Sequence, residues 1–286
     1  MITLAEFDAA ARLIASHVPP TPQYAWPLIE AELGVKCWVK HENHTPIGAF
    51  KVRGGLVFVD RLKREDPSVA GIVSATRGNH GQSLAFAARA HGLACAIVVP
   101  HGNSAEKNAA MRAFGAEVIE VGRDFDEAKP AAARIAEERG WAFVPSFHLD
   151  LVKGVGTYAV ELMRAVPDLE VIFAPIGLGS GVCGLVTAKA ALGHRAEIVG
   201  VVSDRADAYA RSLAAGHPVE TTTPADTYAD GMAVRVPSPE ALAIMKAGVS
   251  RIVTVDDRAI AAAPRLLWRA THNAAEGAGE IGRAHV

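Results

Sequence analysis

Residues 71–82 read GIVSATRGNHGQ, an apolar run followed by a polar, glycine-containing turn and then by an alanine-rich stretch. The apolar run predicts a buried strand over residues 71–74, and the stretch behind the turn predicts a helix over residues 81–91. The same order recurs along most of the chain. Repetition of strand and helix is typical of parallel α/β sheets, and nearly continuous apolar strands indicate sheets covered by helices on both faces.

Six further strands and four further helices follow this pattern. We expect the strands at residues 36–40, 95–99, 117–121, 170–174, 197–202 and 251–255. We expect the helices at residues 105–114, 124–139, 151–165 and 182–192, the second of them capped by the carboxylate of Asp124. The predicted fold class is therefore α/β, with parallel twisted sheets flanked by helices.

The composition of the chain argues against a nucleic-acid-binding, membrane or secreted protein. The chain has 286 residues, with 29 Lys and Arg against 31 Asp and Glu, so the net charge of −2 offers nothing to nucleic acid. Half of the residues are hydrophobic, which suits a buried core, yet no apolar stretch approaches the roughly 20 residues of a membrane span. The N-terminus does not resemble a secretory signal, and three scattered cysteines predict no disulfide framework. We expect a cytoplasmic enzyme without membrane or nucleic-acid partners.

Three segments carry candidate chemistry. Residues 49–54 read AFKVRG, in which Lys51 lies between apolar residues; a desolvated lysine is a nucleophilic amine. Residues 74–82 form a turn between a strand and a helix, which places free N–H groups where a carboxylate or phosphate binds. Residues 175–184 read PIGLGSGVCG, a glycine-rich loop whose amides can close around a phosphate.

Other interpretations of these segments stay open. The stretch Gly179–Gly184 fits the G-x-G-x-x-G pattern, and Asp204 follows about 20 residues later, as in NAD-binding proteins. An NAD-dependent oxidoreductase is therefore an alternative, and a non-catalytic binding protein is another. The pair His41 and His44 has a spacing one residue short of a zinc motif and is better explained as a polar loop, and no G-x-S-x-G motif occurs.

In this order and spacing, the three segments resemble the fold-type II pyridoxal-phosphate enzymes, whose two-domain fold is that of the tryptophan synthase β-subunit. The branch that the chain resembles most is threonine/serine dehydratase (ammonia-lyase), and the resemblance extends to about residue 279. It implies that the chain dehydrates and deaminates a β-hydroxy amino acid of the threonine or serine type, giving a 2-oxo acid and ammonia. Serine racemase and hydroxyaspartate or phenylserine dehydratase are alternatives within the family.

The resemblance also implies roles for single residues. Lys51 would bind pyridoxal 5'-phosphate covalently and act as the catalytic base, with Phe50 packed near the cofactor ring. Asn79 would hydrogen-bond the cofactor ring oxygen. The substrate carboxylate would be bound by Thr76, Arg77, Gly78, Asn79 and His80, and the cofactor phosphate by Gly177, Leu178, Gly179, Ser180 and Gly181.

Several positions depart from the family pattern. Arg77 stands where the racemases have a serine that works the second face of the substrate, which disfavours racemisation. Two roles for Arg77 stay open, pairing with a distal carboxylate of the substrate or lying on the surface, and so does the identity of the preferred β-hydroxy amino acid. Val202 and Ala208 occupy the positions at which cation-binding members have acidic residues, so we expect no metal site of that kind.

The resemblance predicts two domains and an oligomer. Residues 1–47 and 147–286 would form a large cofactor-binding domain, residues 48–146 a small mobile one, and the protein would be a homodimer or homotetramer. The chain stops just after a helix with no closing strand, so we expect the large domain to be incomplete at its C-terminus. We also interpret residues 280–286, EIGRAHV, as foreign sequence.

Overall fold

The computed structural model describes residues 2–222, 225–274 and 276–280, and the chain divides into two compact units. The first unit comprises Met1–Asp8, Pro20–His44 and Gly156–Val286, and the second comprises Ala9–Pro19 and Thr45–Val155. Residues 9–19 join the second unit because Ala10, Ile14 and Val18 are buried in its core. Which unit holds the cofactor and which one moves stay predictions. Residues 281–286, most of the segment interpreted as foreign, lie outside the described residues.

The second unit is built on a parallel four-stranded sheet in the order β5-β4-β3-β6. Its strands are β3 (Gly71–Ala75), β4 (Ala94–Val99), β5 (Glu117–Glu120) and β6 (Ala142–Phe143). The two central strands pair in register, with Ile72 opposite Cys95. The expected strands at residues 71–74, 95–99 and 117–121 are confirmed to within one residue at each end.

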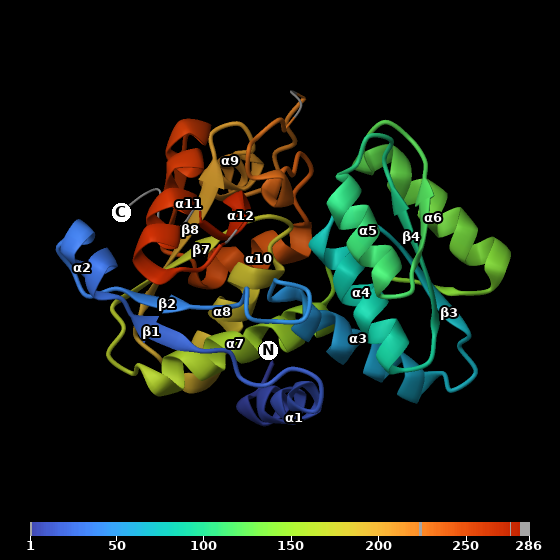
Figure 1. Cartoon of the computed structure of the whole chain (residues 1–286), viewed down its shortest axis with the longest axis horizontal. Coiled ribbons are helices and arrows are strands. Elements are labelled where there is room, and N and C mark those ends of the chain that lie inside the picture. Colours follow the sequence, from blue (N-terminus) through green and yellow to red (C-terminus); the bar gives the residue numbers. More distant parts are fainter. Residues whose placement is uncertain (1, 223–224, 275, 281–286) are drawn as a thin grey trace. The chain divides into compact units, whose positions relative to one another are not determined.

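Helices cover both faces of this sheet (Figure 1). Ile72 and Ile97 point to the face covered by α3 (Lys51–Glu65), α4 (Asn79–Ala90) and α5 (Ala105–Ala113). Val73 and Val98 point to the opposite face, which α6 (Phe125–Arg139) covers. Asp124 caps α6 as predicted, because its carboxylate accepts a hydrogen bond from the Glu127 amide at 3.0 Å. The alternation explains why the strands are apolar on both sides.

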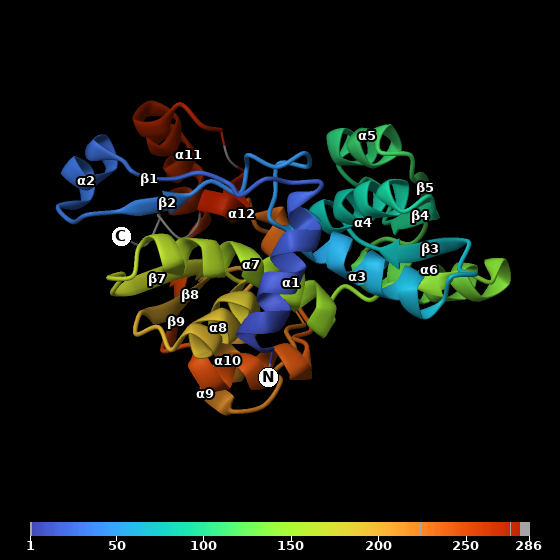
Figure 2. The ribbon, with the colours of Figure 1, turned by 90° about the horizontal axis from the view of Figure 1, so that it is seen from below.

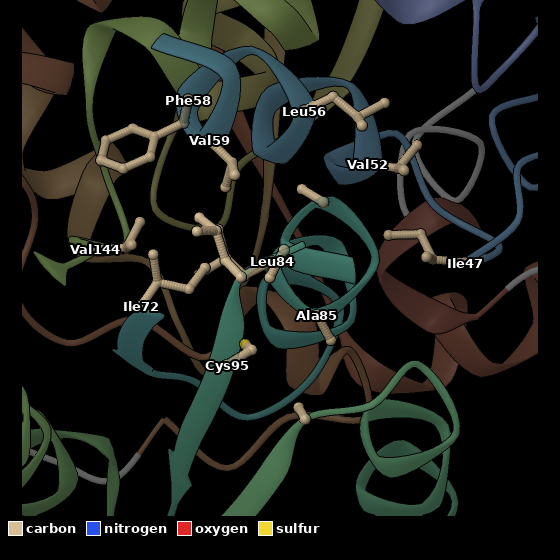
Figure 3. Close-up of a cluster of buried hydrophobic side chains, with 14 of the residues drawn as sticks. Ile47, Val52, Leu56, Phe58, Val59, Ile72, Leu84, Ala85, Cys95 and Val144 are labelled. Carbon is tan, nitrogen blue, oxygen red and sulfur yellow. The ribbon is translucent and has the colours of Figure 1, made fainter. Parts of the chain in front are cut away.

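The larger core cluster of this unit packs α3 and α4 against each other and against the sheet. Figure 3 shows Leu84 of α4 among Val59 of α3 and Ile72 of β3, with Val144 nearby. Leu84, Val59 and Ile72 are completely buried. Burial of each such side chain contributes about 1.5–3 kcal/mol, so this cluster fixes the position of the two helices whose first residues are candidate site residues.

The first unit contains a parallel three-stranded sheet in the order β7-β8-β9. The strands are β7 (Val171–Pro175), β8 (Glu197–Ser203) and β9 (Arg251–Val255). Figure 2 shows α8 (Ser180–Leu192) and α10 (Pro239–Gly248) on one side of this sheet and α11 (Asp257–Thr271) on the other. The remaining helices with residues in this unit are α1 (Leu4–Ala15), α2 (Pro27–Leu33), α7 (Leu149–Ala165), α9 (Ala208–Ala215), the short 3-10 helix η1 (Asp230–Met232) and α12 (Gly277–Glu280).

One expected strand belongs to neither parallel sheet. The run at residues 36–40 forms only β2 (Trp38–Lys40), which pairs antiparallel with β1 (Gln23–Ala25). The strand itself is confirmed over residues 38–40, and its antiparallel pairing was not predicted because β1 has only three residues. Cys37, Cys95 and Cys183 are free cysteines. In the part of the chain that the structure describes, no helix is both long and apolar enough to cross a membrane.

Candidate active site

The predicted site residues fall into two groups, one in each compact unit. The group in the second unit, which we call the lysine site, consists of Phe50, Lys51, Thr76, Arg77, Gly78, Asn79 and His80. The group in the first unit, which we call the glycine loop, consists of Gly177, Leu178, Gly179, Ser180 and Gly181. The glycine loop and the turn at residues 76–80 each follow the carboxyl end of a parallel strand and lead into a helix, which is where ligands bind in sheets of this kind.

Lys51 is the first residue of α3, and Phe50 precedes it as the N-cap residue. The ammonium nitrogen of Lys51 lies 4.9 Å from the centroid of the Phe50 ring. The backbone of Lys51 is fixed by α4, because the Ser83 hydroxyl donates a hydrogen bond of 2.6 Å to the Lys51 carbonyl oxygen. Nothing in the sequence indicated this role for Ser83, which depends on two helices meeting. The backbone of the lysine is therefore held by a contact that does not involve its own amine.

The loop between β3 and α4 is held by its own threonine. The Thr76 hydroxyl accepts a hydrogen bond of 3.1 Å from the Gly78 amide, and the Thr76 amide bonds the carbonyl of Val98 at 3.1 Å. Within the described residues, no hydrogen bond uses the backbone amides of Arg77 and His80, which stay available to an anion. The first turn of α4 adds its favourable dipole there. The predicted binding of the substrate carboxylate by this loop fits these free donors.

His80 is a buried neutral base beside the lysine. Its side chain is 8% exposed, and its Nε2 atom has no hydrogen-bond partner. Burial and, to a smaller extent, the nearby charge of Lys51 lower the pKa of His80, and a hydrogen bond to the Pro145 backbone raises it; together they bring the pKa to about 3. The imidazole thus stays uncharged at neutral pH and adds no positive charge that would compete with Lys51 for anions.

The shifted pKa of His80 makes the stability of the fold depend on pH. In the unfolded chain the pKa returns to 6.5, so between pH 6.5 and about 3 the unfolded state binds one proton more than the folded state. The contribution of His80 to the free energy of unfolding is fully present above pH 6.5 and is lost as the pH falls toward 3. We expect a loss of about 2 kcal/mol in the free energy of unfolding between pH 6.5 and 5, measured by urea denaturation.

The variant His80→Gln cannot take up this proton, so its free energy of unfolding should fall less steeply over the same range. The matched control is the same substitution at an exposed histidine, His217→Gln, measured over the same pH range. Equal slopes for wild type and His80→Gln would show that His80 is not buried in its neutral form.

The glycine loop depends on two of its glycines. A Cβ atom on Gly177 would lie 2.7 Å from the backbone oxygen of Gly231, which cannot move aside as a flexible side chain can. Gly179 has φ of +102°, a conformation that other residues rarely adopt, and a Cβ there would lie 2.6 Å from Met245. Larger residues at either position would displace the loop from the start of α8.

The backbone amides of the glycine loop are unpaired. In the described part of the chain, no hydrogen bond uses the N–H groups of residues 177–182, and they lie at the N-terminus of a 13-residue helix. Such a set of donors, together with the helix dipole, suits a phosphate group. The residues present therefore fit the phosphate of pyridoxal phosphate.

Tyr209 anchors the glycine loop, although nothing in the sequence indicated it. Its hydroxyl donates a 3.0 Å hydrogen bond to the Leu178 carbonyl and accepts one of 3.0 Å from the Ser238 amide. The side chain is buried, and burial raises the pKa of Tyr209; the neighbouring Cys183 raises it too, while the Ser238 amide lowers it. The phenol thus ties the loop to the first residue before α10.

Removing this hydroxyl should loosen the loop. In Tyr209→Phe the Leu178 carbonyl and the Ser238 amide lose their shared partner, so we expect the free energy of unfolding to fall by about 1–3 kcal/mol. Urea denaturation with and without pyridoxal phosphate measures the loss, which should be larger in the presence of the cofactor. Tyr24→Phe is the control, since Tyr24 is 51% exposed. Equal effects of the two substitutions would contradict the anchoring role.

The candidate metal positions hold no suitable ligands. Val202 and Ala208 are both completely buried hydrocarbon side chains. His41 is buried and accepts a hydrogen bond of 2.9 Å from the Trp26 indole, so it belongs to a polar contact within the fold. Across residues 2–222, 225–274 and 276–280 there is no group of three or more His, Cys, Asp or Glu side chains placed to hold a metal ion.

Comparison with known proteins decides the family. The model of the family described as pyridoxal-phosphate dependent enzyme matches residues 14–286. The chain belongs to this family. The predicted resemblance, the α/β fold class and the cofactor are thus confirmed, and the glycine loop belongs to a pyridoxal-phosphate enzyme rather than to an NAD-binding one.

Individual relatives of the chain include several ammonia-lyases. The chain is 33% identical to an L-threonine ammonia-lyase of Thermotoga maritima over 100% of its length and 71% of the relative's. It is 32% identical to an L-threo-3-hydroxyaspartate ammonia-lyase of Saccharomyces cerevisiae, over 87% of this chain and 76% of that protein. The solved structure of the processed form of threonine deaminase isoform 2 from Solanum lycopersicum superposes with a TM-score of 0.91 at 29% identity, covering 98% of this chain and 81% of the other.

Several relatives are considerably longer than this chain. It spans 71%, 62% and 51% of the length of three curated threonine ammonia-lyases and dehydratases.

Proposed function

We propose that the chain is the catalytic part of a lyase that dehydrates and deaminates a β-hydroxy amino acid to a 2-oxo acid and ammonia. The observation that carries the proposal is the lysine site: an amine at the start of α3, beside a neutral histidine and a loop with free amides, in a member of this family. The names of the relatives, L-threonine ammonia-lyases among them, support the same reaction class.

Each group of residues has a separate task in this reaction. The amides of the glycine loop bind the cofactor phosphate, and the amides of Arg77 and His80 bind the substrate carboxylate. Pyridoxal phosphate, when bound, supplies the electron sink that stabilises negative charge on the substrate α-carbon. Lys51 would hold the cofactor, and its amine would take the proton from the α-carbon.

Charge supports the choice of Lys51 as the base. His80 stays neutral beside Lys51. It therefore adds no positive charge that would oppose the uptake of a proton by the Lys51 amine. The carboxylate-binding amides orient the α-carbon hydrogen toward the amine, and orientation of this kind lowers the barrier to proton transfer. The substrate then loses its β-hydroxyl as water, and hydrolysis of the product returns one water and releases ammonia.

Racemisation is the second reaction that the family offers, and Arg77 argues against it. A racemase needs a second proton donor on the other face of the substrate. An arginine is poorly suited to that task, because a guanidinium does not give up its proton in proteins.

The test uses the whole chain loaded with pyridoxal phosphate. Borohydride reduction followed by digestion and mass spectrometry should find the added mass of the cofactor on the peptide containing Lys51. The loaded protein should then release ammonia and a 2-oxo acid from threonine or serine. An unmodified Lys51 peptide after reduction, or cofactor attachment without ammonia release from any β-hydroxy amino acid, would refute the proposal.

The remaining expectations follow from the same family. We expect a homodimer or a homotetramer, acting on a small amino acid in the cytoplasm. Analytical sedimentation of the protein loaded with pyridoxal phosphate measures the number of chains in the oligomer.

A further inference from the structure

Arg77 is a cation without a partner in the middle of the lysine site. Its side chain is exposed, and among the residues that the structure describes no carboxylate or carbonyl bonds its guanidinium. The residues on either side are held in place: Thr76 is buried, and Gly78 is hydrogen-bonded to it. The Arg77 guanidinium can therefore bind a second anion in addition to the carboxylate that suits the amides of this loop.

Lys107 brings another cation to the same loop. A Cβ atom built on Gly78 would lie 2.7 Å from Cδ of Lys107 and 3.3 Å from its Nζ, so the lysine side chain runs directly over Gly78. Lys107 comes from α5, whose first turn is fixed by the Ser104 hydroxyl accepting a hydrogen bond from the Lys107 amide. The sequence did not indicate this lysine, because 29 residues separate it from Gly78.

Arg77 adds a full positive charge to a loop whose backbone amides already suit one carboxylate. The α-carboxylate of an amino acid carries a single negative charge, which the free amides of Arg77 and His80 and the first turn of α4 already attract. A substrate with one carboxylate, held by these amides, would make no ion pair with Arg77.

We propose that Arg77 and Lys107 form a subsite for a second carboxylate, so that the preferred substrate is a β-hydroxy amino acid with an acidic side chain, such as 3-hydroxyaspartate. This inference rests on the proposed lyase function and specifies its substrate class. The guanidinium binds a carboxylate through two parallel hydrogen bonds, and the ammonium of Lys107 adds a point charge. The name of the yeast relative, a 3-hydroxyaspartate ammonia-lyase, is compatible with such a substrate.

The first test compares substrates with the loaded enzyme. We expect kcat/KM for L-threo-3-hydroxyaspartate to exceed that for L-threonine. In Arg77→Gln the ratio of the two kcat/KM values should fall roughly 10- to 100-fold, the worth of one or two hydrogen bonds between charged groups. Lys107→Met, which keeps the length of the side chain, should lower the ratio in the same direction. Arg89→Gln is the control, because Arg89 is an exposed arginine on α4 and should leave the ratio unchanged.

The second test does not require turnover. Succinate carries two carboxylates and butyrate one, and neither can react, so calorimetric titration of the loaded enzyme compares their affinities. Succinate should bind at least roughly tenfold more tightly than butyrate, and Arg77→Gln should abolish that difference. Equal affinities in the wild type, or a difference that survives Arg77→Gln, would overturn the subsite.

The two proposals fail in different ways. Ammonia release from threonine with an unchanged substrate ratio in Arg77→Gln would overturn the subsite and leave the lyase function standing. Selective succinate binding by a protein that releases no ammonia from any β-hydroxy amino acid would support the subsite and refute the lyase function.

Discussion

Lys51→Ala should lower kcat by at least roughly 10²- to 10⁴-fold, the usual contribution of a positioned proton-transfer group, and it should abolish covalent attachment of the cofactor. The fold should survive, because α4 holds the Lys51 backbone through the Ser83 hydroxyl and this bond to the carbonyl does not need the lysine side chain. Turnover is measured as 2-oxo acid formed, and attachment by mass spectrometry after borohydride reduction.

Lys129→Ala is the matched control, since Lys129 is an exposed lysine on α6 with no part in either group of site residues. Its kcat should equal that of the wild type, and the thermal midpoints of the two variants should agree within a few degrees. Normal turnover in Lys51→Ala would remove the basis of the catalytic assignment.

Gly177→Ala should weaken binding of pyridoxal phosphate roughly 10- to 100-fold. The new methyl group would lie 2.7 Å from the Gly231 backbone oxygen, and overpacking of this size costs about 1–3 kcal/mol. Because neither partner is a flexible side chain, the loop itself must shift, and its amides then no longer converge on the phosphate. Fluorescence titration of the unloaded protein with the cofactor measures the change.

The control for this variant is a glycine at the other end of the same helix. Gly193 has φ of +64° and ends α8, and a Cβ there would meet nothing within 4 Å. Gly193→Ala should reduce stability because of the strained φ, yet leave the affinity for the cofactor unchanged. A loss of affinity in Gly193→Ala equal to that in Gly177→Ala would mean that α8 as a whole, rather than the loop, determines binding.

The sequence predicted the features that depend on neighbouring residues. The strand before each loop and the helix behind it follow from local hydrophobic patterns, and β9 has the predicted bounds, Arg251–Val255. Asp124 was identified as an N-cap because a cap involves residues only three positions apart. The glycine loop and the AFKVRG segment were recognisable because their chemistry lies within a few consecutive residues.

What the sequence could not predict depends on residues distant along the chain. Tyr209 bonds a carbonyl 31 residues before it, and no local pattern distinguishes it from any other buried tyrosine. The approach of Gly231 to Gly177 requires η1 to lie against the loop, and η1 is too short to leave a periodic pattern. The neutral state of His80 likewise results from enclosure of its side chain, which only the packed core creates.

The hydroxyl of Tyr209 has a consequence for variation in this chain. The Tyr209 hydroxyl bonds both the Leu178 carbonyl and the Ser238 amide. A substitution near residue 238 can therefore displace the glycine loop without contacting it. Natural or engineered substitutions in the stretch between α9 and α10 would then weaken retention of the coenzyme. Such a protein would fold normally but lose its coenzyme, and with it its colour, during purification.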